Sequence, residues 1–107
     1  MTDNEERRRW PRRLANLKVV HSHPKTQSTA VDFSKDVSRG GLFFWSKRQR
    51  AVGDRFPLEL SATQSQTLQG VVRGTGRVTR VTSEGIAVTF ESLDPKSEER
   101  LLAFLSR

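Results

Sequence analysis

Apolar and polar residues alternate along most of this chain, which is the pattern of strands that bury one face. Six segments carry the pattern, and short runs rich in glycine, proline, serine or aspartate separate them. The segments are 14–21, 29–34, 42–45, 55–61, 68–82 and 86–90. Six short strands joined by turns predict an all-β fold, in the form of a small antiparallel barrel.

Two of the predicted strands contain residues that interrupt a regular ladder. Pro57 lies within 55–61, and proline lacks the backbone N–H that a central strand donates to its neighbour. We therefore expect 55–61 to be an edge strand. The segment 68–82 contains three glycines, which predict bulges or a barrel corner in a long, bent strand.

The last part of the chain changes period, which predicts a helix over residues 94–106. Asp94 can cap its N-terminus, and Pro95 fits the first helical position. Leucines and Phe104 then recur at helical spacing and form one apolar stripe. The expected fold is a small six-stranded antiparallel β-barrel with one C-terminal α-helix. Residues 14–107 form this domain, and residues 1–13 form a flexible, arginine-rich arm.

Composition narrows the classes of function. The 107 residues suffice for one domain with one modest core. The formal net charge of +7 predicts an anionic partner, and the absence of cysteine excludes disulfides and thiolate catalysis. No segment is apolar enough to span a bilayer, and the first residues lack the pattern of a secretory leader. We therefore expect a cytoplasmic location without membrane insertion.

The arm concentrates basic side chains in residues 7–13, which read RRRWPRR. The run contains an R-x-x-x-R spacing in two registers, Arg8/Arg12 and Arg9/Arg13. A guanidinium group is a rigid fork of donors, which suits both the O6/N7 edge of guanine and phosphate oxygens. The arm is thus a candidate site for a guanine nucleotide or another polyanion.

A second motif follows the predicted strand 29–34. Residues 36–41 read D-x-S-x-x-G, with Asp36, Ser38 and Gly41 at the defined positions. A short acid and a hydroxyl beside glycines predict a turn that can present hydrogen-bonding groups to a small ligand.

The two motifs in this order, with the strands and helix that follow, resemble the PilZ domain, a bacterial receptor module for cyclic di-GMP. The resemblance covers nearly the whole chain and implies the same barrel-and-helix fold. It also implies signal transduction without enzymatic activity. The expected ligand is the second messenger cyclic di-GMP, with no cofactor or metal, and the expected partner is an effector protein that the sequence does not identify.

The resemblance also assigns site residues. Arg8 and Arg12 would grip guanine and phosphate, and Arg7 matches an additional arginine that often precedes the motif. Asp36 would accept hydrogen bonds from the guanine N1 and N2 groups, Ser38 would bond a base or phosphate, and Gly41 would permit close backbone approach. Further candidates beside the two motifs are Arg9, Trp10, Arg13, Arg39 and Gly40.

Two alternatives stay open beside the receptor. One is a PilZ-like protein-interaction module that does not bind cyclic di-GMP. The other is a small basic barrel that binds nucleic acid, which agrees less well because the arginines concentrate in one arm whereas Asp36 and Ser38 suggest a discrete pocket. An enzyme is not indicated, since no acid–base pair, metal set or nucleophile stands out.

Two further groups of side chains outside the motifs are candidates for a functional role. His21 and His23 lie two apart at a predicted strand end, but no third ligand is near, so we expect a solvent-exposed pair rather than a metal site. Alternation places at least one side chain of the run 43–45 (Phe-Phe-Trp) outward. That side chain lines the ligand site or a partner surface, unless it packs under the C-terminal helix.

Overall fold

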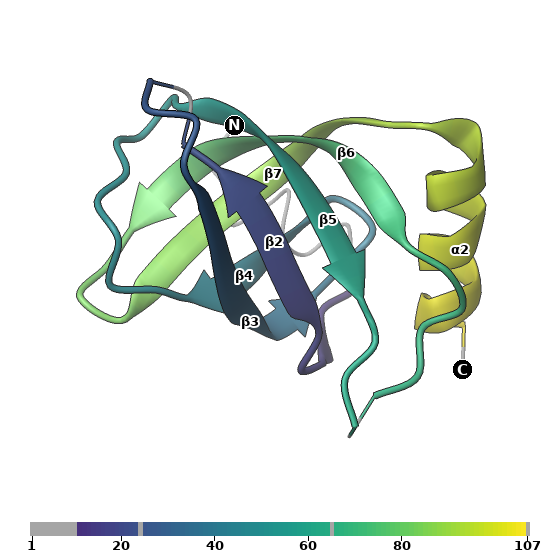
Figure 1. The fold of residues 1–107 in the computed structure, drawn as a ribbon. Helices are drawn as coiled ribbons and strands as arrows, with labels where there is room; N and C mark the ends of the chain where they lie inside the picture. The colour runs from purple at the N-terminus through teal and green to yellow at the C-terminus, as the bar shows by residue number, and fades with distance from the viewer. Residues whose placement is uncertain (1–10, 24, 65, 107) are drawn as a thin grey trace.

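The computed structural model describes residues 11–23, 25–64 and 66–106, and within them the chain forms seven strands and one helix (Figure 1). The elements are β1 (Arg13–Leu14), β2 (Lys18–Ser22), β3 (Thr29–Val37), β4 (Gly41–Trp45), β5 (Arg55–Ser61), β6 (Val72–Val81), β7 (Gly85–Leu93) and α2 (Pro95–Leu105). All strand pairs are antiparallel, in the order β1-β3-β2-β5-β6-β7-β4, and pairing of β3 with β4 closes the barrel. The prediction of a six-stranded antiparallel barrel with a C-terminal helix is confirmed, with the short β1 added.

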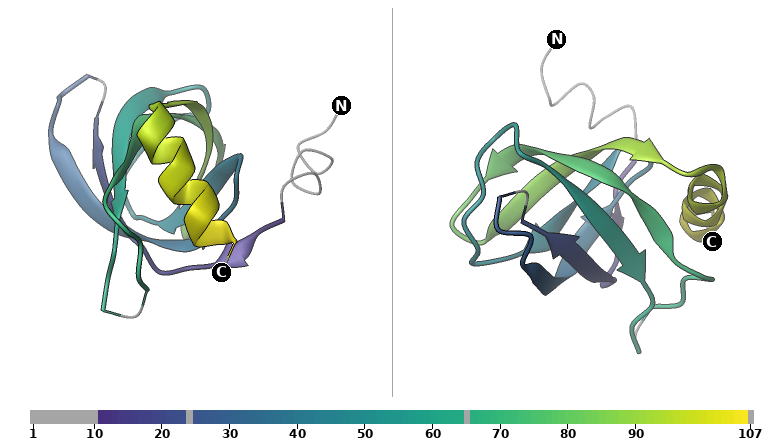
Figure 2. Two further views of the ribbon diagram at one scale, coloured as in Figure 1. Left: turned by 90° about the vertical axis from the view of Figure 1, so that its right-hand side faces the viewer. Right: turned by 45° about the horizontal axis from the view of Figure 1, so that its top comes forward.

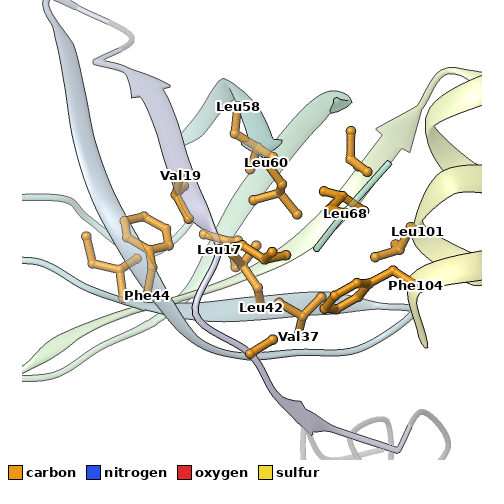
Figure 3. Close-up of a cluster of buried hydrophobic side chains, with 14 of the residues drawn as sticks. Leu17, Val19, Val37, Leu42, Phe44, Leu58, Leu60, Leu68, Leu101 and Phe104 are labelled. Atoms are coloured by element: carbon orange, nitrogen blue, oxygen red, sulfur yellow. The ribbon is translucent and has the colours of Figure 1, made fainter. Parts of the chain in front are cut away.

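The helix α2 lies across one end of the barrel (Figure 2). Asp94 caps it as predicted, because its side chain accepts a hydrogen bond of 2.8 Å from the backbone N–H of Ser97. Leu101 and Phe104 from the apolar stripe are buried against the barrel interior. The core therefore runs from the barrel into the face of the helix, where Figure 3 shows both side chains near Leu68 and Val37.

The single strand expected over 14–21 is divided into β1 and β2. Both pair with β3, and the residues between them are tied to β3 by hydrogen bonds. The buried Ser34 hydroxyl donates to the carbonyl oxygen of Ala15 and accepts from the backbone N–H of Leu17 at 2.8 Å. Arg13, which the sequence pattern placed in the arm, is the first residue of β1.

The expectation that Pro57 marks an edge strand is wrong, because β5 pairs with both β2 and β6. Pro57 lies opposite Thr75 of β6, but the ladder with β2 begins only at Leu58, opposite His21. Proline is compatible with this position because the β2 ladder does not extend to it. The bulges predicted among the glycines are present, since the register of β6 with β7 shifts between Thr75 and Gly76.

A bulge in β3 determines which way the second motif faces. The register with β4 shifts between Ser34 and Asp36, so Lys35 is the extra residue. Ser34 and Val37 are buried, whereas Lys35 is exposed. Asp36 lies opposite Phe43 on β4. The residues on either side of Phe43, Leu42 and Phe44, point into the core, so Phe43 and its partner face outward. Asp36 therefore lies on the outer surface of the barrel, although regular alternation from Ser34 would have turned it inward.

Candidate functional site

The two sequence motifs meet at one ion pair on the outer surface of the barrel. The Nη1 atom of Arg12 donates to Oδ1 of Asp36 at 2.7 Å. The contact follows from the pairing of β1 with β3, in which Leu14 lies opposite Asp36, so the residues just before β1 run beside the end of β3. The carboxylate of Asp36 keeps further lone pairs for other donors, and both side chains are partly open to solvent.

Ser38 holds the turn between β3 and β4. Its backbone N–H donates to the carbonyl oxygen of Gly41 at 2.8 Å, and its Oγ accepts from the N–H groups of Gly40 and Gly41, each at 3.2 Å. The side chain is buried. The hydroxyl also donates to the carbonyl oxygen of Gly41 at 3.3 Å. Ser38 therefore shapes the corner beside Asp36 rather than presenting a free donor.

Gly41 permits a close approach of backbones, and the partner is strand β7. A Cβ atom at this position would collide with the carbonyl oxygen of Val88. The absence of a side chain therefore lets β4 pair tightly with β7, where Gly41 lies opposite Thr89. Like Ser38, Gly41 fixes the framework of the motif.

The remaining candidates occupy different surroundings. Arg13 contacts the last turn of α2, since its Nη1 donates to the carbonyl oxygen of Phe104 at 2.5 Å. Arg39 and Gly40 line a groove of about 380 Å³ between β7 and α2. Arg7, Arg8, Arg9 and Trp10 lie outside the residues that the structure describes. Of the two R-x-x-x-R registers, the one ending at Arg12 reaches Asp36.

Outward side chains of β3 and β4 complete the surface around Asp36. Phe33 lies opposite Trp45, and both are exposed to over two fifths. Lys35 lies between Phe33 and Asp36 along β3, and Phe43 is the register partner of Asp36 on β4. Alternation predicted that at least one residue of 43–45 would face outward, but no local pattern indicated that a bulge would place Lys35 among these rings.

The histidine prediction is wrong for His21, which is 1% exposed. Its Nε2 lies 2.8 Å from Oδ2 of Asp32, and its Nδ1 lies 2.7 Å from Nη2 of Arg50. Because a guanidinium only donates, Nδ1 is the acceptor and the ring proton sits on Nε2. Burial lowers the pKa of His21, with the hydrogen bond to Asp32 opposing that effect. His21 is thus a neutral, structural residue at the end of the barrel away from α2.

Two negative findings concern the described residues alone. Across 11–23, 25–64 and 66–106, no three side chains of the histidine, cysteine, aspartate or glutamate type gather in a way that could hold a metal ion. In the same part of the chain, no helix combines the length and apolar character needed to cross a bilayer.

Comparisons with known proteins bear on this architecture. A family model described as the PilZ domain matches residues 6–107. No curated protein matches the chain significantly.

Solved structures share the fold at low identity. The Bacillus subtilis inhibitor of motility, MotI/DgrA, superposes with a TM-score of 0.75 at 16% identity, over 94% of this chain and 51% of that one. This chain therefore spans about half the length of that protein. The PilZ domain of Escherichia coli YcgR, solved with c-di-GMP, gives 0.70 at 20% identity over 94% and 90% of the two chains. The PilZ domain of CeSA from a cellulose-synthesising bacterium gives 0.62 at 14% identity over 90% and 96%.

The family model spans both motifs and all seven strands, and the barrel with its closing helix is the fold of the PilZ domains of YcgR and CeSA. The chain belongs to the PilZ domain family.

Proposed function

We propose that this protein is a non-enzymatic receptor that binds cyclic di-GMP and signals through a partner protein. The observation that carries the proposal is the 2.7 Å contact of Arg12 with Asp36, which joins the R-x-x-x-R and D-x-S-x-x-G motifs on one surface. The YcgR PilZ domain, which shares this fold, was solved with cyclic di-GMP, and this supports the choice of ligand.

The chemistry of the joined motifs suits guanine. Asp36 accepts hydrogen bonds from the N1–H and N2–H groups of one base, which a carboxylate matches with its two oxygens. Arg8 and Arg12 read the O6/N7 edge and pair with phosphate, with Arg7 adding a third cation. Ser38 and Gly41 hold the corner on which the ligand rests. Arg9, Trp10, Arg39 and Gly40 are further candidate contacts of the ligand.

A guanine that binds the Asp36 carboxylate would compete with Arg12 for its oxygens. The Arg12 guanidinium would then turn toward a phosphate of the ligand. Arg13, the next residue, holds the last turn of α2 through Phe104. A shift of Arg12 is therefore passed to α2, and the surface around this helix is where an effector protein would sense the ligand.

Isothermal titration calorimetry with cyclic di-GMP tests the proposal. We expect micromolar or tighter binding by the wild type, and a loss of about 5- to 100-fold in affinity in Arg12→Ala, Asp36→Ala and Arg8→Ala. Arg73→Ala is a matched control, because it also removes an exposed arginine from an ion pair, here with Glu59 on β5. The control should bind as the wild type does.

Two results would contradict the receptor. Wild-type protein that shows no heat with the dinucleotide would leave the interaction module as the better description. Salt-sensitive, length-dependent binding to oligonucleotides, with no response to cyclic di-GMP, would favour the nucleic-acid barrel instead.

A further inference from the structure

Aromatic and basic side chains gather on the outer surface next to Asp36. The rings of Phe43 and Trp45 pack edge to face, with centroids 5.5 Å apart and planes at 86°. The Nζ atom of Lys35 lies 5.2 Å from the Trp45 ring centre and 5.8 Å from that of Phe43. Phe33 adds a third ring opposite Trp45 on β3.

This aromatic surface is open to solvent. Trp45 is 41% exposed and Phe33 is 45% exposed, whereas Phe43 is largely covered. The indole thus rests on a buried ring and keeps part of its surface free. An exposed indole leaves apolar surface in contact with water. A ligand that covers this surface therefore gains binding free energy.

A groove of about 560 Å³ lies beside the candidate site. Its lining includes Leu14, Phe33, Lys35 and Trp45. Leu14 is the register partner of Asp36, so this lining residue is a direct neighbour of the Arg12–Asp36 pair. Asp36 lies opposite Phe43, and Trp45 is two residues further along β4, or about 7 Å at the rise of a strand. One compact dinucleotide can reach both positions.

We infer that the groove is a stacking subsite, in which the Trp45 indole packs against a purine of the cyclic dinucleotide held at Asp36. The Lys35 ammonium, which lies over the Trp45 ring, then moves aside and pairs with a phosphate of the same ligand. This inference rests on the proposed function and extends it, because neither sequence motif includes Lys35 or Trp45.

The surroundings favour a planar nucleobase over an aliphatic occupant. Base–aromatic stacking uses the face of an indole, and the Lys35 ammonium that lies over the Trp45 ring matches a ligand that carries phosphates. The Asp36 carboxylate, next to the lining residue Leu14, has hydrogen-bonding partners on guanine. An aliphatic peptide or a lipid chain would leave both the Asp36 and the Lys35 charges without a role.

Intrinsic fluorescence gives the direct test. The chain has two tryptophans, so Trp10→Phe leaves Trp45 as the single reporter. Titration of this variant with cyclic di-GMP should quench its emission along the binding isotherm that calorimetry gives for the same variant. In the otherwise wild-type chain, Trp45→Ala should weaken binding about 5- to 100-fold, and Trp45→Phe, which keeps a ring, should weaken it less.

Val52→Ala is the matched control, since it removes an exposed apolar side chain from the loop between β4 and β5. Thermal melts of each variant establish that the barrel is intact. The stacking subsite would be overturned if Trp45→Ala binds with wild-type affinity and the ligand leaves the emission of Trp10→Phe unchanged. If Arg12→Ala still binds weakly in that case, the receptor function stands. No binding by the wild-type protein would overturn both.

Discussion

Arg13 and Phe104 lie 91 positions apart in the sequence and contact each other twice. The guanidinium donates to the carbonyl oxygen of Phe104 at 2.5 Å, and its carbon lies 4.8 Å from the centre of the Phe104 ring. Figure 2 shows β1 beside the C-terminal end of α2. A cation at the carboxyl end of a helix is favourable because the helix dipole is negative there. The start of the described chain is thus tied to its last helix.

Arg13→Ala should destabilise the protein by about 1–2 kcal/mol, because it removes a charged hydrogen bond and a cation–π contact together. Chemical denaturation monitored by circular dichroism measures the change. Arg13→Lys keeps the charge but not the planar fork, and should recover part of the loss. Equal stability of Arg13→Ala and wild type would show that the contact contributes nothing in solution.

Ser34→Ala should cost about 1–3 kcal/mol despite the small change in volume. The Ser34 hydroxyl is buried, donates to the carbonyl oxygen of Ala15 and accepts from the N–H of Leu17. Alanine leaves both backbone groups without that partner inside the barrel. Ser28→Ala, in the exposed hairpin between β2 and β3, is the control and should leave the unfolding midpoint almost unchanged.

His21 should make the stability of the protein fall as the pH falls below neutrality. Its pKa is lower in the folded state than the value of 6.5 in an unfolded chain, so the unfolded state binds the proton first. Stability is therefore full above the unfolded pKa and is lost as the pH drops through it toward the folded pKa. Protonation of Nδ1 also removes the acceptor that Arg50 uses.

The free energy of unfolding measured between about pH 7 and pH 5 checks this. Asp94 does not interfere in that window, because its hydrogen bonds to Ser97 lower its pKa and its contribution to stability is lost only at more acidic pH. His21→Gln should flatten the dependence at some cost in stability. A flat profile for the wild-type protein would refute the assignment.

Gly41→Ala should destabilise the barrel by at least about 2–3 kcal/mol, since the added methyl group meets the backbone of β7 at Val88. Gly76→Ala offers a comparison, because its methyl group would meet only the end of the Leu58 side chain, which can rotate. Thermal unfolding should therefore rank Gly41→Ala well below Gly76→Ala. If Gly41→Ala folds with wild-type stability, the glycine of the motif is not required by the β4–β7 contact.

Much of the architecture could be predicted from local pattern. Alternation predicted the strands, and Asp94 with Pro95 predicted where the helix begins, because capping and period depend on neighbouring residues alone. The two motifs could also be identified from the sequence. In the structure, Arg12 of the first motif contacts Asp36 of the second.

The same local pattern could not assign faces. Val31 and Phe33 are the large apolar residues of the predicted strand 29–34, yet both are over two fifths exposed, while Ala30 and Ser34 face the interior. Alternation with a period of two shows that a strand has two different faces, but it does not show which face is buried. Ser34 can face inward because Ala15 and Leu17 supply its partners, and these lie in another part of the chain.

The sequence by itself determined the set of strands, the capped helix and the two charged motifs, since each depends on residues close together along the chain. Tertiary structure alone decided that β3 bulges at Lys35, which turns Asp36 outward beside Arg12, and that His21 is buried against Asp32 and Arg50. The physical reason is that bulges, burial and ion pairs are fixed by which strands become neighbours, and closure of a barrel joins residues that no local pattern relates.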